Sequence, residues 1–135
     1  MKPGTLLFVL LVIGYLGLEG YVASRTKYRM EPDYIFSQYT EAATAAAACG
    51  DFDPAVRDKF ASNLRYTRRR AGEALAEQSP TAAEADIDAM VAGLEQTAIA
   101  ETRALIDASG CSDIEVKKLL TRFKNRARLN LPTGE

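Results

Sequence analysis

Residues 49–78 read CGDFDPAVRDKFASNLRYTRRRAGEALAEQ and contain both a helix stop and a helix start. Gly50 follows Cys49 and can adopt the left-handed conformation that commonly ends a helix. Asp53 and Pro54 form a preferred start, because Asp caps a first turn and Pro fits the first helical position. Apolar side chains then recur every three or four residues to the end of the stretch, which predicts an amphipathic helix.

Further helices are predicted on both sides of this one. Residues 33–48 contain no helix breaker and are rich in alanine. Two later segments begin with a capping-box pattern, in which Ser or Thr is followed three residues on by Glu, and these predict helices starting near Thr81 and Ser112. The first of the two ends at Gly110 and the second near Arg128. No segment alternates apolar and polar residues as a strand does, so the chain is predicted to be all-α.

The connections between these helices are short, and short connections make successive helices antiparallel neighbours. The expected fold is a small up-down helical bundle of about four helices over residues 33–128, with a C-terminal tail over 129–135. In that arrangement Cys49 and Cys111 lie at the same end of the bundle, which predicts a disulfide that closes a loop of about 60 residues. The alternative is a pair of buried free thiols.

The amino-terminal segment indicates in which cellular compartment the protein lies. Residues 3–18 (PGTLLFVLLVIGYLGL) carry no charged side chain. As a helix, residues 5–23 would extend about 28 Å, which is enough to cross the hydrocarbon core of a bilayer. Residues 1–23 are therefore predicted to be a transmembrane signal-anchor in contact with the lipid bilayer, followed by a juxtamembrane linker over 24–32. A stripe of small residues is expected to pack against another transmembrane helix, unless the span merely tolerates glycine: Gly14, Gly17 and Gly20.

Two alternatives to this topology stay open. One is a cleaved signal peptide, since the small residues at 22–24 loosely fit a cleavage site. The other is a cytoplasmic domain. Three basic residues lie within 25–29 on the C-terminal side of the span, against Lys2 on its N-terminal side, and the more basic flank of a transmembrane segment tends to lie in the cytoplasm. The short amino-terminal tail and the predicted disulfide favour export, since disulfides belong to oxidising compartments. We expect a single-pass protein of a bacterial inner membrane with its C-terminal domain in the periplasm.

Composition excludes several classes of function. The 17 Lys and Arg are balanced by 18 Asp and Glu, for a formal net charge of −1, which does not favour binding to nucleic acid. The chain has no His, and two Cys alone cannot complete a four-ligand zinc site. It contains no phosphate-binding loop and no nucleophile motif. We therefore predict no catalytic residue, no cofactor, no metal site and no small-molecule substrate.

A cluster of arginines within residues 54–78 is the remaining functional signal. Its four guanidinium groups fall within six residues and cannot all find carboxylates on one helix turn, which predicts contact with an acidic protein partner: Arg65, Arg68, Arg69 and Arg70. Residues 73–88, at the tip of the same hairpin, are mainly acidic and disfavour anionic lipid. The simpler alternative is ion pairing with the acidic helix that follows.

Together these features predict a non-enzymatic interaction protein. In this interpretation the chain is an accessory or assembly subunit of a bacterial inner-membrane complex. The main alternative is a cleaved, soluble periplasmic binding or inhibitor protein. These two functions differ in the mass of the mature chain.

Overall fold

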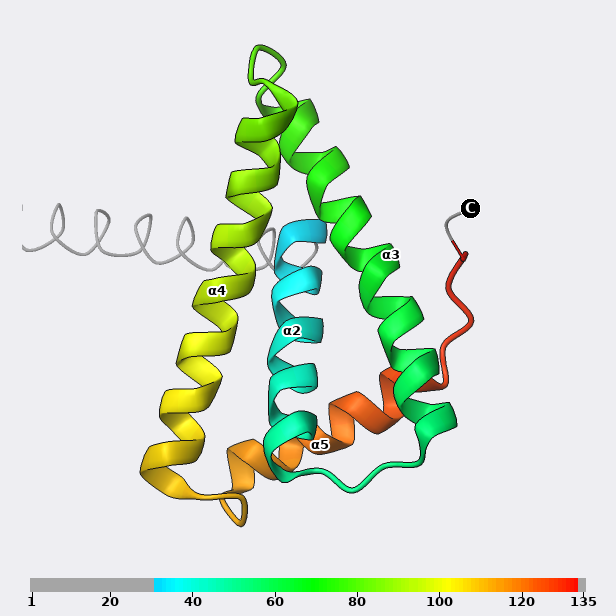
Figure 1. Ribbon diagram of the computed structural model, residues 1–135, viewed down its shortest axis with the longest axis vertical. Helices are drawn as coiled ribbons and strands as arrows, with labels where there is room; N and C mark the ends of the chain where they lie inside the picture. The colour runs from blue at the N-terminus through cyan, green and yellow to red at the C-terminus, as the bar shows by residue number, and fades with distance from the viewer. Residues whose placement is uncertain (1–30, 134–135) are drawn as a thin grey trace, which may run out of the picture. The chain divides into compact units, whose positions relative to one another are not determined.

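The computed structural model describes residues 31–133, which form four α-helices and no strand (Figure 1). The all-α prediction is confirmed for this part of the chain. The helices lie close to the predicted ranges: α2 (Pro32–Cys49), α3 (Pro54–Gln78), α4 (Glu84–Ser109) and α5 (Ile114–Ala127). Pro32, predicted to end the linker, is instead the first residue of α2, because proline fits the first turn of a helix.

No helix within residues 31–133 combines the length and the apolar character needed to cross a bilayer. The predicted transmembrane segment over 5–23 lies outside the described residues. The same holds for residues 24–30 of the predicted linker and for the last two residues of the tail. The glycine stripe predicted for helix packing also lies outside the described residues: Gly14, Gly17 and Gly20.

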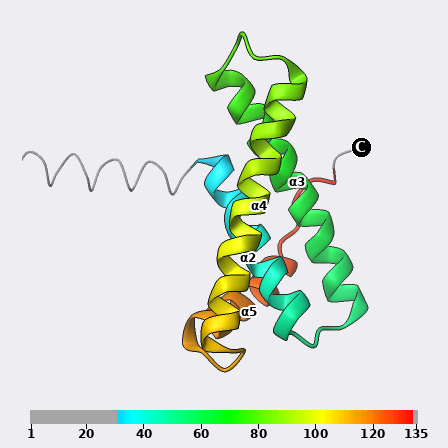
Figure 2. The ribbon, with the colours of Figure 1, turned by 60° about the vertical axis from the view of Figure 1, so that its left-hand side comes forward.

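The first three helices alternate in direction, with α2 between α3 and α4 (Figure 1). The fourth helix departs from the predicted up-down pattern, since α5 lies across the end of the bundle at which α2 and α4 end (Figures 1 and 2). The cause is its buried face, which reaches both α2 and α3. Phe123 of α5 stacks on Phe60 of α3 with ring centroids 4.0 Å apart, and its ring lies 4.7 Å from that of Phe52.

The core consists of two clusters of buried side chains. The larger one surrounds the stacked phenylalanines where α2, α3 and α5 meet, and it contains Tyr39, Ala42, Phe60, Phe123 and Ala127. The smaller one lies where α2 meets the α3–α4 hairpin, and it contains Phe36, Ala71 and Val91. Burying each large apolar side chain contributes about 1.5–3 kcal/mol, so the buried aromatic residues of α2, α3 and α5 contribute most of the packing energy.

A disulfide joins Cys49, the last residue of α2, to Cys111 in the turn between α4 and α5. The two Cα atoms lie 5.5 Å apart, a usual separation for a disulfide. The predicted pairing is therefore confirmed. Gly110, directly before Cys111, has a φ of 77° and ends α4, as predicted.

Two predicted helix starts differ in detail from the structure. The Ala82 N–H donates to the Ser79 carbonyl at 3.0 Å, so Thr81 lies in a turn before α4 rather than at its cap. The Asp86 carboxylate instead accepts a hydrogen bond from the Ala83 N–H at 3.3 Å. At α5 the cap is Asp113, one residue after Ser112, and its carboxylate accepts from the Glu115 N–H at 2.8 Å. At α5 an aspartate therefore replaces the predicted Ser as the cap, whereas at α4 Ala83 occupies the cap position and Asp86, in the first turn of the helix, binds its N–H.

Candidate functional site

The arginine cluster lies in the middle of α3, whose unbroken helical course sets the directions of the four side chains. Residues four apart share a face of a helix, so Arg65 and Arg69 project from one side of α3. Arg68 projects toward α4, where it forms an ion pair with Glu95. Its guanidinium also lies 6.0 Å from the centroid of the Phe36 ring.

Three of the four arginines are paired within the chain. Besides the Arg68 pair, Arg69 and Arg70 share Glu73, with Arg69 Nε 3.7 Å from Glu73 Oε1. All three side chains remain about half exposed, so each pair contributes under about 1 kcal/mol. Arg65 forms no ion pair in the part of the chain that the structure describes. Arg68 thus pairs with the acidic helix that follows, as the simpler alternative expects, and Arg65 is the member of the cluster that has no carboxylate partner among residues 31–133.

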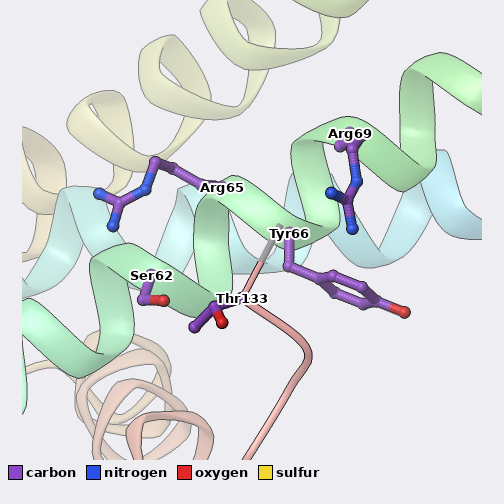
Figure 3. A pocket seen from close by; sticks show the side chains of 5 residues that line it. All are labelled: Ser62, Arg65, Tyr66, Arg69 and Thr133. Atoms are coloured by element: carbon purple, nitrogen blue, oxygen red, sulfur yellow. The ribbon is translucent and has the colours of Figure 1, made fainter. Parts of the chain in front are cut away.

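A pocket of about 210 Å³ lies between α3 and the C-terminal segment (Figure 3). It is lined by Ser62, Arg65, Tyr66, Arg69 and Thr133. Figure 3 shows that four of these side chains come from α3, whereas Thr133 reaches the pocket from the chain after α5. The Arg69 guanidinium lies 5.4 Å from the centroid of the Tyr66 ring, a cation–π contact that restricts its motion.

These groups favour an anionic ligand atom. Guanidinium groups donate several hydrogen bonds in a fixed plane and bind carboxylates well. The hydroxyls of Ser62 and Thr133, which also line the pocket, can add donors. Because Arg65 has no carboxylate partner among residues 31–133 and Arg69 has only a long contact with Glu73, both can bind a carboxylate of another molecule.

Asn63 is a residue that the sequence interpretation missed, and it holds the Thr133 side of this pocket in place. Its Nδ2 donates to the carbonyl oxygens of Arg126 at 2.9 Å and of Leu129 at 2.8 Å. These bonds fasten the end of α5 and the following segment to α3. The available signal was a polar residue between Phe60 and Thr67, on the face of α3 that the apolar spacing directs inward.

A second group of polar contacts ties α5 to α2. Arg122 lies 3.2 Å from Glu41, and burial raises the pKa of the Glu41 carboxyl although Arg122 opposes the shift. Arg126 donates to Gln38 at 3.0 Å, and its guanidinium lies 4.8 Å from the centroid of the Tyr39 ring. These contacts connect two helices, and we assign them a structural role.

Comparison with other proteins adds no family assignment. The chain matches no protein-family model, and no curated protein or solved structure is significantly similar to it.

Proposed function

We propose that this chain is a non-enzymatic interaction protein that serves as an accessory or assembly subunit of a bacterial inner-membrane complex. In this proposal residues 1–23 anchor it and the helical domain lies in the periplasm. One observation carries the interaction role: Arg65 has no ion pair among the described residues and borders an exposed polar pocket. The partner that it implies is a protein with an acidic side chain at its surface.

Two features support the proposed location. The disulfide between Cys49 and Cys111 is of a kind that persists in the periplasm and is rare in the cytosol. The uncharged run over residues 3–18 supports an anchor, because an apolar helix of about that length plus its flanks reaches across the hydrocarbon core.

The charges at the tip of the α3–α4 hairpin, further along α3 than the pocket, support a protein partner over a lipid surface. The turn that joins α3 to α4 is flanked by Glu77 and Glu84, which would be repelled by anionic headgroups. Arginine and tyrosine are also enriched among residues that dominate binding between proteins. Arg65, Tyr66 and Arg69 present both types within two helical turns.

Location is tested by the intact mass of the chain extracted from native membranes with free thiols alkylated at lysis. We expect a full-length chain without alkylation. A mature chain that starts near Arg25 would favour the soluble binding or inhibitor protein. Two alkylated thiols on a full-length chain would place the domain in the cytoplasm, and either result would overturn the proposed location.

Partner binding is tested by charge reversal at Arg65. We expect Arg65→Glu to reduce co-purification of the partner from native membranes at least about fivefold, which corresponds to the loss of more than about 1 kcal/mol of binding energy. The matched control is Lys124→Glu, because Lys124 of α5 is also exposed and also lacks an ion pair within residues 31–133. Equal losses with both variants would indicate a nonspecific charge effect and would contradict the assignment.

A further inference from the structure

The helix α2 is covered on three sides and open on the fourth. It contacts α3, α4 and α5. Since successive residues of a helix point about 100° apart, the residues that meet α5, such as Gln38 and Glu41, lie away from Ala43 and Ala47. On the side of these alanines lies a groove of about 430 Å³ between α3 and α4.

The floor of the groove consists of small side chains of α2, namely Thr40, Ala43, Thr44, Ala47 and Ala48. The Thr40 hydroxyl donates to the Phe36 carbonyl at 3.0 Å, and the Thr44 hydroxyl donates to the Thr40 carbonyl at 2.8 Å. Because both hydroxyl protons are used within α2, the floor contains no donor that a ligand must satisfy. The floor is therefore apolar, and its side chains are short.

The walls of the groove are Leu64 of α3 and Ile99 of α4. Near the hairpin tip, the ion pair between Arg68 and Glu95 links the two walls and limits the groove. Toward the α5 end the two helices diverge, as Figure 1 shows. Arg103 lines the groove in this wider part, and it forms no ion pair with any described residue. The groove is thus a mainly apolar channel whose lining includes two charged side chains: Glu95, which is paired with Arg68, and Arg103, which has no ion-pair partner among residues 31–133.

We infer that this groove binds one amphipathic α-helix of a protein partner, with an acidic side chain of that helix paired to Arg103. A helix inserts apolar side chains spaced three and four residues apart into such grooves. The small floor lets the incoming helix approach α2 closely, because the distance between packed helices depends on the side chains at the contact. The unpaired Arg103 selects an acidic flank over a basic one.

This surface is distinct from the arginine pocket. Leu64 and Arg65 are consecutive in α3 and so point to different sides of that helix. The inference therefore goes beyond the proposed function, and it holds or fails independently of Arg65.

The test uses the full chain in lipid nanodiscs and two labelled peptides of about 18 residues, with leucines at helical spacing on one face. One peptide carries glutamates beside the leucine face and the other carries lysines at the same positions. By fluorescence anisotropy we expect the glutamate peptide to bind at least about fivefold more tightly than the lysine peptide. Arg103→Glu should reverse this preference.

A groove-filling substitution provides the steric test. Ala47→Trp places a large side chain on the floor and should weaken binding of the glutamate peptide at least about tenfold. Its matched control is Ala104→Trp, at an exposed position on the side of α4 away from the groove, which should bind as the unsubstituted chain does. Ala47 is itself exposed, and thermal melting of the variant confirms that the domain is folded.

Several results would overturn the inference. It fails if neither peptide binds, or if Ala47→Trp leaves binding unchanged. It also fails if light scattering shows a dimer that Ala47→Trp converts to a monomer, because the groove would then hold a second copy of this chain. Arg65→Glu should bind the glutamate peptide normally, so that failure at one surface is distinguishable from failure at the other.

Discussion

Replacing Asn63 with Asp tests how the C-terminal segment is held against α3. The two side chains are nearly equal in size, so packing beside Phe60 is preserved while the Nδ2 donor becomes an oxygen. Asn63 is only 1% exposed, and Nδ2 donates to the carbonyl oxygens of Arg126 and Leu129 at 2.9 and 2.8 Å. Asn63→Asp therefore places an acceptor against two other acceptors.

The expected loss of stability follows from these contacts. Two hydrogen bonds disappear, each worth about 0.5–1.5 kcal/mol net, and a buried oxygen is left unsatisfied at a further cost of about 1–3 kcal/mol. We expect Asn63→Asp to lower the free energy of unfolding by about 2–6 kcal/mol at neutral pH. Burial disfavours the carboxylate and raises its pKa above the unfolded value of about 3.9. The penalty should consequently shrink as the pH falls, because the protonated acid regains one donor.

The measurement is urea unfolding of the full chain followed by circular dichroism at about pH 7 and about pH 4. Asn130→Asp is the matched control, since Asn130 is exposed in the same C-terminal segment, and it should change stability by less than about 0.5 kcal/mol. A loss below about 1 kcal/mol for Asn63→Asp, or a loss independent of pH, would refute the argument.

Three further perturbations have defined outcomes. The double substitution Cys49→Ser and Cys111→Ser should cost about 4 kcal/mol in urea unfolding, because the disulfide spans a sequence separation of 62 residues; a loss under about 1 kcal/mol would contradict this. Because burial raises the pKa of Glu41 above its usual value, the stability that this carboxyl contributes should fall as the pH rises through its pKa, and the difference in free energy of unfolding between the unsubstituted chain and Glu41→Gln should change accordingly in urea unfolding at a series of pH values; a difference independent of pH would contradict this. Gly110→Ala should lower Tm by at least about 4 °C, since a φ of 77° with a ψ of 171° costs residues other than glycine about 1–3 kcal/mol, and an unchanged melting curve would oppose this.

Local signals in the sequence account for most of the helix boundaries. Asp53 and Pro54 start α3, and Gly110 ends α4, because each acts on backbone groups within one turn of itself. The pairing of Cys49 with Cys111 was also predictable, since it required only that the end of α2 and the start of α5 meet at one end of the bundle. That condition is satisfied even though α5 lies across the bundle.

The features that local signals missed depend on contacts between distant segments. The direction of α5 follows from Phe123 packing on Phe60 and Phe52, and no spacing within residues 114–127 specifies that contact. The role of Asn63 likewise depends on carbonyl groups more than 60 positions away. The arginine pocket was predicted only as a cluster of charges, because which of them remain unpaired depends on the position of Glu95 in α4.

The disulfide also determines how tension would pass through the domain. A force applied between Glu31 and Leu131 would run along α2, cross from Cys49 to Cys111, and continue along α5. The two cysteines are 62 residues apart in the sequence, which corresponds to about 200 Å of extended chain. While the disulfide is intact, a force applied at these two points cannot extend that segment. Under such a force the α3–α4 hairpin could lose its packing against α2 and α5, but its own chain could not be extended.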